Sequence, residues 1–271
     1  MSTVKLVRAS PAPALRPYVR HFQQREATVT ERTVVYPISA RAEQLLEFYL
    51  QDRYRVRSRV SGAIGSAARS VVVGPSTRRA VELVLLGRFD VFTVHFQPSG
   101  FHQLFGMHMS ELADRCYEAR AVIGPLASAM EQRLADAPTF QTRVDIATRA
   151  LLRRAHALAT PNAVARAANR VLLHRGTLRI PETAAGVGLS VRQFERTFQE
   201  QVGITPRLYA RIVRFQAAVD ARMSDAHRSW ADIAHDLGYY DQMHMVHDFR
   251  QFSDDNPTRF LETFHTMPVR W

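Results

Sequence analysis

The sequence predicts an α+β protein with a β-rich N-terminal barrel or sandwich, a helical middle segment and an all-α C-terminal domain. Three patterns predict this class: period-2 alternation between positions 33 and 96, helical spacing of apolar residues from position 124, and a helical pattern near position 190 that recurs downstream. With 271 residues, 46% of them hydrophobic, the chain can bury two cores. We therefore expect three parts: residues 1–123, 124–160 and 161–271.

Short strands account for most of the first part. After an extended stretch over residues 9–18, strands are predicted over residues 33–38, 44–50 and 54–60. A row of arginines alternates with apolar residues in the last of these, which is typical of a strand with one polar face. The row comprises Arg53, Arg55, Arg57 and Arg59. An exposed strand face is the simpler interpretation, and contact with anions is the alternative.

A predicted hairpin follows. Residues 71–75 form a short apolar strand, and residues 82–87 and 90–96 form two strands around a short loop at residues 87–89. Strands at this density, without long helices between them, favour a small antiparallel barrel or sandwich. Residues 98–107 are expected to close one end as a short helical turn.

Two amphipathic helices are predicted between residues 124 and 160. Leu126, Met130 and Leu134 repeat at helical spacing, and a second set does so downstream. That set is Phe140, Val144, Ala147, Leu151 and Leu152. The helices either link and dimerise the protein or pack against their own domain. Residues 160–162 then break the helix and mark a domain boundary.

The C-terminal part contains a helix-turn-helix pattern. Gly188 follows a short run of small residues and can take the left-handed conformation that a tight turn needs. Ser190 is a suitable N-cap for a helix over residues 191–201, because its hydroxyl can accept from free N–H groups of the first turn. Phe194 and Phe198 lie four residues apart and are expected to face the core together.

The same pattern recurs downstream, in a turn that is one residue longer. Gly238 lies 50 residues after Gly188, and Phe249 lies 51 after Phe198. Asp241 takes the place of Ser190 as N-cap of a helix over residues 242–252. A helix that begins at Thr205 and Pro206 connects the two units. Two such units on one face of DNA place their second helices in successive major grooves, about 34 Å apart.

Polar side chains on the outer faces of these helices are candidates for DNA contact. Arg192 and Arg196 suit guanine, because a guanidinium can bind its O6 and N7 bidentately. Glu195 either accepts from cytosine N4 or holds Arg192 or Arg196 in place, and the second role is favoured. Met243 and Val246 suit a thymine methyl group. Phosphate contacts are expected from Arg207, Arg211 and Arg250. The remaining candidates for base or backbone contact are Gln193, Gln199, Gln242 and His247.

These motifs resemble the AraC/XylS family of bacterial transcription regulators. The matching residues of the first unit are Gly188, Leu189, Ser190, Phe194, Glu195, Arg196, Phe198, Gly203, Ile204, Thr205 and Pro206. Those of the second are Ile233, Ala234, Gly238, Tyr239, Asp241, Gln242, His244, Phe249 and Pro257. Two positions depart from the family pattern. Asp254 replaces a glycine, which a left-handed cap tolerates, and His247 replaces an arginine, which weakens base reading by the second helix.

The resemblance implies a sequence-specific regulator that binds double-stranded DNA and works with RNA polymerase. In that family a β-rich, often cupin-like domain precedes the DNA-binding domain and senses a small-molecule effector. Residues 1–123 match this plan in order and size only. The helices of residues 124–160 then imply a homodimer or a relay, and activation and repression both remain open.

Other features limit the alternatives. The net charge of +11 favours a polyanionic partner, but residues 161–271 carry only +2 of it, which disfavours a non-specific architectural DNA binder. A single cysteine, Cys116, is consistent with a reducing cytoplasm. Neither a signal peptide nor an apolar run of membrane-spanning length is present, so no membrane contact is expected.

Enzymatic activity is not expected. The alternative, a small-molecule or metal enzyme in the N-terminal domain localised by a DNA-binding module, finds no nucleophile–base pair or phosphate loop in the sequence. His95, His102 and His108 lie close in sequence but without a second acidic ligand, so we predict no metal site and no cofactor.

Overall fold

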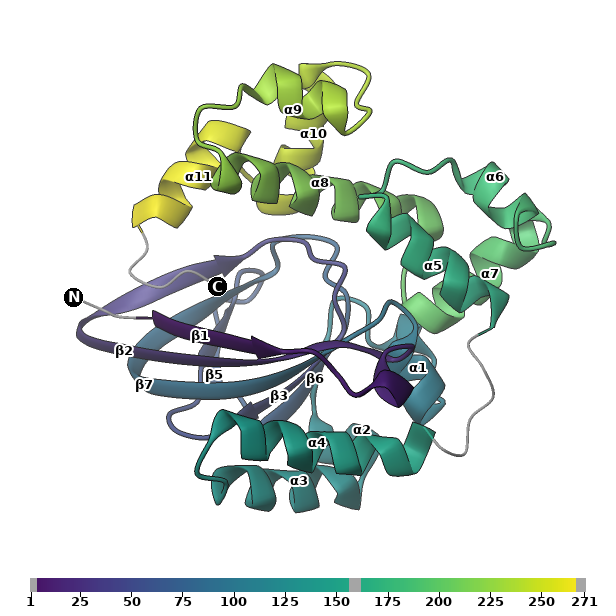
Figure 1. The fold of residues 1–271 in the computed structure, drawn as a ribbon. Coiled ribbons are helices and arrows are strands. Elements are labelled where there is room, and N and C mark those ends of the chain that lie inside the picture. Colours follow the sequence, from purple (N-terminus) through teal and green to yellow (C-terminus); the bar gives the residue numbers. More distant parts are fainter. Residues whose placement is uncertain (1–3, 156–161, 267–271) are drawn as a thin grey trace.

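The computed structural model describes residues 4–155 and 162–266. The predicted α+β class is confirmed: Figure 1 shows a sheet with helices α2–α4 beneath it and a helical domain, α5–α11, above it. Within the described ranges, no helix is both long and apolar enough to cross a membrane. Of the predicted boundary at residues 160–162, Thr160 and Pro161 lie outside the described residues. Asn162 is the N-cap of α5, and its side chain accepts from the Ala165 N–H.

The sheet is antiparallel throughout and follows the order β1-β2-β7-β3-β6-β8. β4 pairs with both β7 and β5 and folds away from this path. The strands are β1 (Val4–Ala9), β2 (Val19–Ile38), β3 (Leu45–Tyr49), β4 (Arg55–Ser58), β5 (Ile64–Ser66), β6 (Ser70–Val73), β7 (Val81–Phe96) and β8 (Cys116–Glu118). Two long strands, β2 and β7, therefore form its centre.

β7 runs without a break, so the predicted hairpin at residues 87–89 is wrong. Gly87 has a φ of +122°, and it pairs with Val29 instead of turning the chain. The register of β2 shifts between Val29 and Val34, so the pairing of β2 with β7 is irregular next to Gly87. The Arg88 N–H donates to the Asp52 carboxylate at 2.7 Å. The sequence also did not predict β2 before residue 33, where pairing with β1 and β7 stabilises the strand.

One face of the sheet packs against helices. α2 (Ala119–Ile123), α3 (Pro125–Ala135) and α4 (Phe140–Ala155) cover it, and Phe22, Phe92 and Leu134 belong to the shared core. Both helices predicted between residues 124 and 160 thus pack on the N-terminal domain. The predicted turn at residues 98–107 contains α1 (Gly100–Phe105), and two short 3-10 turns, η1 (Pro13–Leu15) and η2 (Met109–Glu111), complete this domain.

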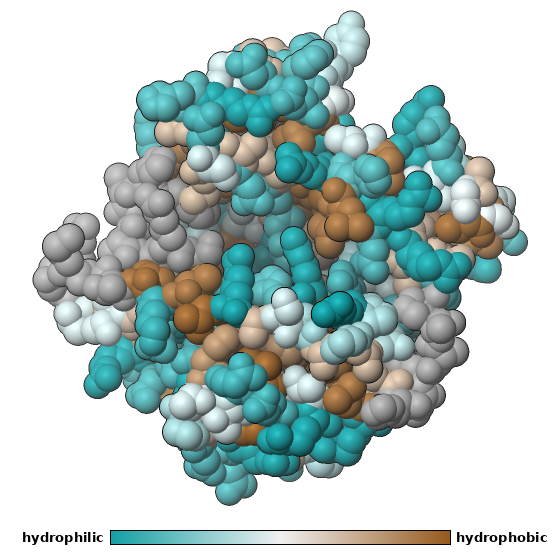
Figure 2. Space-filling model, in the orientation of Figure 1, coloured by the Kyte–Doolittle hydropathy of each residue, from teal (hydrophilic) through white to brown (hydrophobic). Residues whose placement is uncertain are grey.

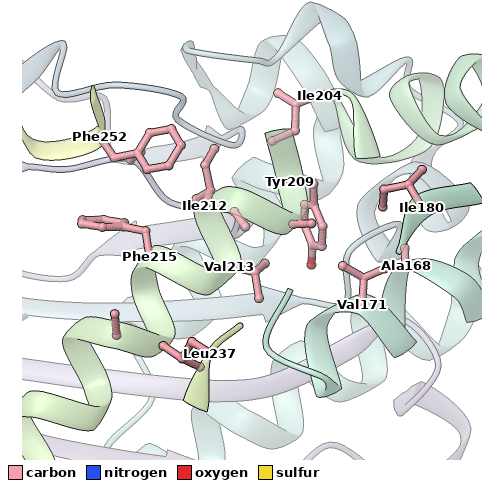
Figure 3. Close-up of a cluster of buried hydrophobic side chains, with 14 of the residues drawn as sticks. Ala168, Val171, Ile180, Ile204, Tyr209, Ile212, Val213, Phe215, Leu237 and Phe252 are labelled. Carbon is pink, nitrogen blue, oxygen red and sulfur yellow. The ribbon is translucent and has the colours of Figure 1, made fainter. Parts of the chain in front are cut away.

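The helical domain is organised around α8. Its helices are α5 (Ala163–Leu173), α6 (Ile180–Ala185), α7 (Val191–Val202), α8 (Pro206–Ser224), α9 (Trp230–Asp236), α10 (Gln242–Ser253) and α11 (Pro257–Thr266). Figure 3 shows Val213 of α8 lying toward Val171 of α5, and Phe215 lying toward Phe252 of α10. One core therefore joins both ends of this domain through the helix that was predicted to connect them.

Candidate nucleic-acid interface

The first helix-turn-helix comprises α6, a turn at Gly188 and α7. Gly188 has a φ of +73°, the left-handed conformation that the sequence predicted. The Ser190 hydroxyl accepts from the Gln193 N–H, so Ser190 is the N-cap of α7. The Gln193 side-chain oxygen accepts in return from the Ser190 N–H at 3.2 Å. The side-chain oxygen of Gln193, which we predicted to contact DNA, is therefore engaged in this capping box.

The two faces of α7 differ as the sequence predicted. Phe194 and Phe198 are fully buried, and their ring centroids lie 5.4 Å apart. The polar candidates on the other face remain accessible. Arg192, Gln193, Arg196 and Gln199 are exposed, and Glu195 is half-buried.

The second unit repeats this geometry in α9, a turn at Gly238 and α10. Gly238 has a φ of +65°, and the Asp241 carboxylate accepts from the His244 N–H at 2.7 Å as the N-cap of α10. Met245 and Phe249 are fully buried. Most of the outer candidates are exposed, namely Gln242, Met243, His247 and Arg250, whereas Val246 is half-buried.

Tyr240 is a further candidate that the sequence reasoning missed. Its side chain is 92% exposed and lies directly before the N-cap of α10. The second turn is one residue longer than the first, so the repeat itself marks an inserted residue here. An exposed aromatic ring at the start of a helix that enters a DNA groove can pack against a sugar or a base edge.

Arg211 has a structural partner that its sequence position did not indicate. Its guanidinium donates to the Asp248 carboxylate at 2.6 and 3.1 Å and to the Gln251 side chain at 2.6 Å. Asp248 is fully buried, so this pair ties α8 to α10 inside the domain. We therefore leave Arg211 out of the proposed interface. Glu195 lies 3.9 Å from Arg207 at the start of α8.

A second contact fixes the turn of this unit. The Arg214 guanidinium lies 4.4 Å from the Tyr239 ring centroid and donates to the Gly238 carbonyl at 3.3 Å. Burial raises the pKa of Tyr239, the Asp248 carboxylate adds to the rise, and Arg214 opposes it. The phenol therefore stays neutral at ordinary pH, and the turn is held by contacts from α8.

The carboxyl ends of both α7 and α10 contact the N-terminal domain. At α7, Gly203 has a φ of +102° and lies against Met109 and Pro75, and the Gln44 amide donates to the Val202 carbonyl at 3.2 Å. Gly203 is the left-handed C-cap of this helix. The amino-terminal halves of the helices, which carry most of the candidates, lie away from these contacts.

At α10 the equivalent cap is Asp254, with a φ of +60°. Asp254 is ion-paired with Arg59, and Asp255 lies 3.5 Å from Arg79. The Ala40 N–H donates to the Phe252 carbonyl at 2.8 Å. Arginines near a helix C-terminus also complement its partial negative charge. The N-terminal domain thus contacts α7 and α10 at equivalent points, 51 residues apart in sequence.

The three histidines considered as metal ligands have separate surroundings. His95 stacks on His21 with ring centroids 4.1 Å apart, His102 hydrogen-bonds the Met107 carbonyl, and His108 lies 3.8 Å from Glu200. Across residues 4–155 and 162–266, no three His, Cys, Asp or Glu residues gather in a group that could hold a metal ion.

Comparison with known structures gives distant likenesses. ToxT from Vibrio cholerae O395 shares 8% sequence identity over 98% of this chain and 99% of that chain, with a TM-score of 0.48. Unsaturated fatty acid bound ToxT from strain SCE256 shares 9% identity over 100% and 97% of the two chains, with a TM-score of 0.47. An RmlC-like cupin protein from Desulfovibrio desulfuricans shares 15% over 35% and 81%, with a TM-score of 0.23. These likenesses are too distant to bear on function.

Comparison at the level of sequence is more specific. No match to this chain was found among curated proteins. Residues 7–118 match the model of a domain of unknown function (DUF6597), which lies within the sheet domain. Residues 183–263 match the model of a helix-turn-helix domain and span both units described above. The C-terminal part of this chain is therefore a DNA-binding helix-turn-helix domain of the AraC type.

Proposed function

We propose that this protein is a sequence-specific transcription regulator whose helices α7 and α10 read two successive major grooves. The observation that carries the proposal is the repeated unit itself. Each copy has a capped helix with a buried aromatic face and an outer face of accessible polar residues. Arg192 and Arg196 are assigned to base edges in the first groove, and Gln242 and His247 to those in the second.

Phosphate contacts complete the proposed interface. Arg207 at the start of α8 and Arg250 on α10 are exposed and can reach the backbone on either side of the grooves. Met243 and Val246 are assigned to thymine methyl groups, and Gln199 to adenine or the backbone. Residues 161–271 carry a net charge of only +2. DNA binding by this domain therefore depends on these few contacts more than on a broad cationic surface, which would bind DNA of any sequence.

The N-terminal domain is assigned the role of control. It holds Gly203 and Asp254, the equivalent caps of the two recognition helices, and so can set their separation. Both helices must enter grooves about 34 Å apart, so small changes at these contacts change the DNA affinity. A ligand that alters the N-terminal domain would act through them.

Arg196→Ala tests the assignment of base reading. DNA enriched from random oligonucleotides by the full-length protein serves as the probe, and the Kd is measured at one salt concentration. We expect a loss of about 1–3 kcal/mol on the enriched sequence, from the loss of one bidentate contact. On unselected DNA the variant is expected to bind like the parent protein.

The matched control is Arg133→Ala, which removes one positive charge from the exposed side of α3. It is expected to leave both affinities unchanged. An equal loss for Arg196→Ala on enriched and unselected DNA would assign Arg196 to a phosphate. No loss on either would remove α7 from the interface.

A further inference from the structure

The outer rows of α7 and α10 end beside the N-terminal domain. On α7, the exposed candidates for DNA contact recur at the spacing i, i+4 and i+7, and the C-cap Gly203 continues this spacing at i+11. On α10, the C-cap Asp254 continues the equivalent row in the same way. The two outer rows are Arg192, Arg196 and Gln199 on α7, and Met243, His247 and Arg250 on α10. A duplex that lies along both rows therefore comes close to the part of the N-terminal domain that contacts the caps.

One loop of the N-terminal domain contacts the ends of both helices. It comprises residues 74–80, joins β6 to β7 and is here termed the cap loop. A Cβ at the position of Gly203 would lie 3.0 Å from the Pro75 side chain, so Pro75 packs against the C-cap of α7. Four residues later, the Arg79 guanidinium lies 3.5 Å from the carboxylate of Asp255, just past the end of α10. The middle of the cap loop therefore lies between the carboxyl ends of α7 and α10.

Hydrogen bonds fix the conformation of the cap loop. The backbones of Ser76 and Arg41 exchange two N–H···O=C hydrogen bonds, each of 2.8 Å. The Asp114 carboxylate accepts from the N–H and from the hydroxyl of Thr77, at 2.6 Å in both cases. The Ser76 hydroxyl also donates to the Arg78 carbonyl at 2.9 Å. An ordered backbone thus presents the side chain of Arg78, and binding through it orders little additional chain.

Arg78 is an exposed basic side chain in the middle of the cap loop. Its neighbours have partners, since the Arg79 guanidinium lies 3.1 Å from the Glu82 carboxylate and Arg59 is ion-paired with Asp254. Among the residues that the structure describes, none forms an ion pair or a hydrogen bond with the Arg78 guanidinium. Pairing within the protein therefore accounts for Arg59 and Arg79 but not for Arg78.

The distribution of charge along the chain favours a polyanion at this boundary. Residues 161–271 carry only +2 of the net charge of +11, and residues 1–160 carry the remaining +9. The helical domain by itself thus has little excess charge with which to bind phosphates. Figure 2 shows a recess between the helical domain and the sheet, bordered in several places by hydrophilic surface. The boundary between the domains is therefore partly hydrated, as the exposure of Arg78 also indicates.

The acidic side chains at the boundary are engaged elsewhere. The Asp255 carboxylate lies 3.5 Å from Arg79 and 3.4 Å from Arg259, so it is paired with arginines of both domains. Asp114 contacts the cap loop through its two hydrogen bonds with Thr77. An anion supplied by a partner can therefore bind the exposed Arg78 guanidinium without displacing an internal ion pair.

We propose that Arg78 contacts a phosphate of the duplex between the two major grooves, so that the N-terminal domain binds DNA while it is docked on the helical domain. The inference rests on the proposed function, because that function places α7 and α10 in these grooves. Between successive major grooves, a duplex presents its minor groove and the phosphates that border it. The cap loop lies between the ends of the same two helices and so faces this part of the duplex. A guanidinium binds phosphate oxygens through charge-assisted hydrogen bonds.

Titration of the full-length protein with the enriched DNA at several salt concentrations tests this contact. In B-DNA, each phosphate contact contributes about −0.9 to the slope of log K against log salt concentration. We expect Arg78→Gln to weaken binding severalfold and to make this slope shallower by about 0.9. The loss should be equal on unselected DNA, because a phosphate contact does not depend on the base sequence. Arg78→Lys keeps the positive charge and is expected to keep the slope.

Arg53→Gln is the control with the same change of charge. Arg53 is exposed and lies beside Ser128 and Glu131 of α3, a helix that Figure 1 shows on the side of the sheet away from the helical domain. This variant is expected to leave both the affinity and the slope unchanged. The midpoint of urea unfolding should be the same for Arg78→Gln, Arg53→Gln and the parent protein, because both side chains are exposed.

Three results would overturn the phosphate contact: an unchanged slope for Arg78→Gln, equal losses for Arg78→Gln and Arg53→Gln, or a loss confined to the enriched sequence. Arg196→Ala separates this inference from the proposed function. If Arg196→Ala weakens binding to the enriched DNA and Arg78→Gln does not, α7 reads DNA and the contact by the N-terminal domain is wrong. If Arg78→Gln changes the slope and Arg196→Ala has no effect, the N-terminal domain binds DNA and the reading assigned to α7 fails.

Discussion

Phe249→Ala is expected to destabilise the helical domain by about 3–5 kcal/mol, the usual cost of emptying the place of a buried phenylalanine. Phe249 is fully buried, and its ring centroid lies 4.8 Å from that of Phe215, 5.3 Å from Trp230 and 5.8 Å from Phe260. These neighbours come from α8, α9 and α11, so they cannot all close the cavity by one movement. Domains are typically stable by 5–15 kcal/mol, so such a loss is a large share of the total.

Urea unfolding followed by circular dichroism measures this effect. Phe198→Ala, the equivalent change 51 residues earlier, is expected to fall in the same range, because Phe198 is equally buried beside Phe194 and Tyr209. His247→Ala on the exposed side of α10 is the control and should stay within about 0.5 kcal/mol of the parent. A loss below 1 kcal/mol for Phe249→Ala would mean that α10 does not depend on this core.

The repeat was predictable because its determinants are local. A left-handed glycine and a capping side chain act within one turn, so Gly188, Ser190, Gly238 and Asp241 indicate the helix starts without knowledge of the fold. The same holds for Asp254, which takes the left-handed cap in place of a glycine. The spacing between two such local patterns then identified the tandem arrangement.

The sheet was less predictable because its determinants are distant. Around Gly87 the local pattern indicated a hairpin, but pairing with β2, almost sixty residues earlier in the chain, outweighed it. A short window of sequence around Gly87 contains no information about a strand so far away in the chain. The buried polar residues Gln23, Glu47 and Thr93 were not predicted as neighbours for the same reason, since they meet only when β2, β3 and β7 pair.

The candidate interface contains features with local determinants and features with distant ones. Exposure of Arg192 and Arg196 follows from helical periodicity alone. The pairing of Arg211 with Asp248 depends on how α8 crosses α10, although a carboxylate next to Phe249 on the inward side of the helix was visible in the sequence. A charged residue on the inward side of a helix predicts a partner of opposite charge, and in this structure the partner of Asp248 is Arg211.

Gly203→Ala is expected to separate the N-terminal domain from α7. A Cβ at this position would lie 2.7 Å from the Met109 carbonyl oxygen and 3.0 Å from the Pro75 side chain, and backbone at Met109 cannot give way cheaply. The left-handed φ of +102° adds about 1–2 kcal/mol for any residue with a Cβ. We expect a total loss of about 2–4 kcal/mol in domain docking and stability together.

Gly188→Ala supplies the matched control for this change. Its φ of +73° imposes a similar backbone cost, but a Cβ there would meet no atom within 4 Å. Only Gly203→Ala should therefore separate the two domains and increase the radius of gyration in small-angle scattering. If both variants lose the same stability and keep a compact shape, the contact at Gly203 does not hold the domains together. Control of α7 by the N-terminal domain would then have to act through its other contacts, which include the Gln44–Val202 hydrogen bond, the Ala42–Gln216 hydrogen bond to α8 and the His108–Glu200 pair.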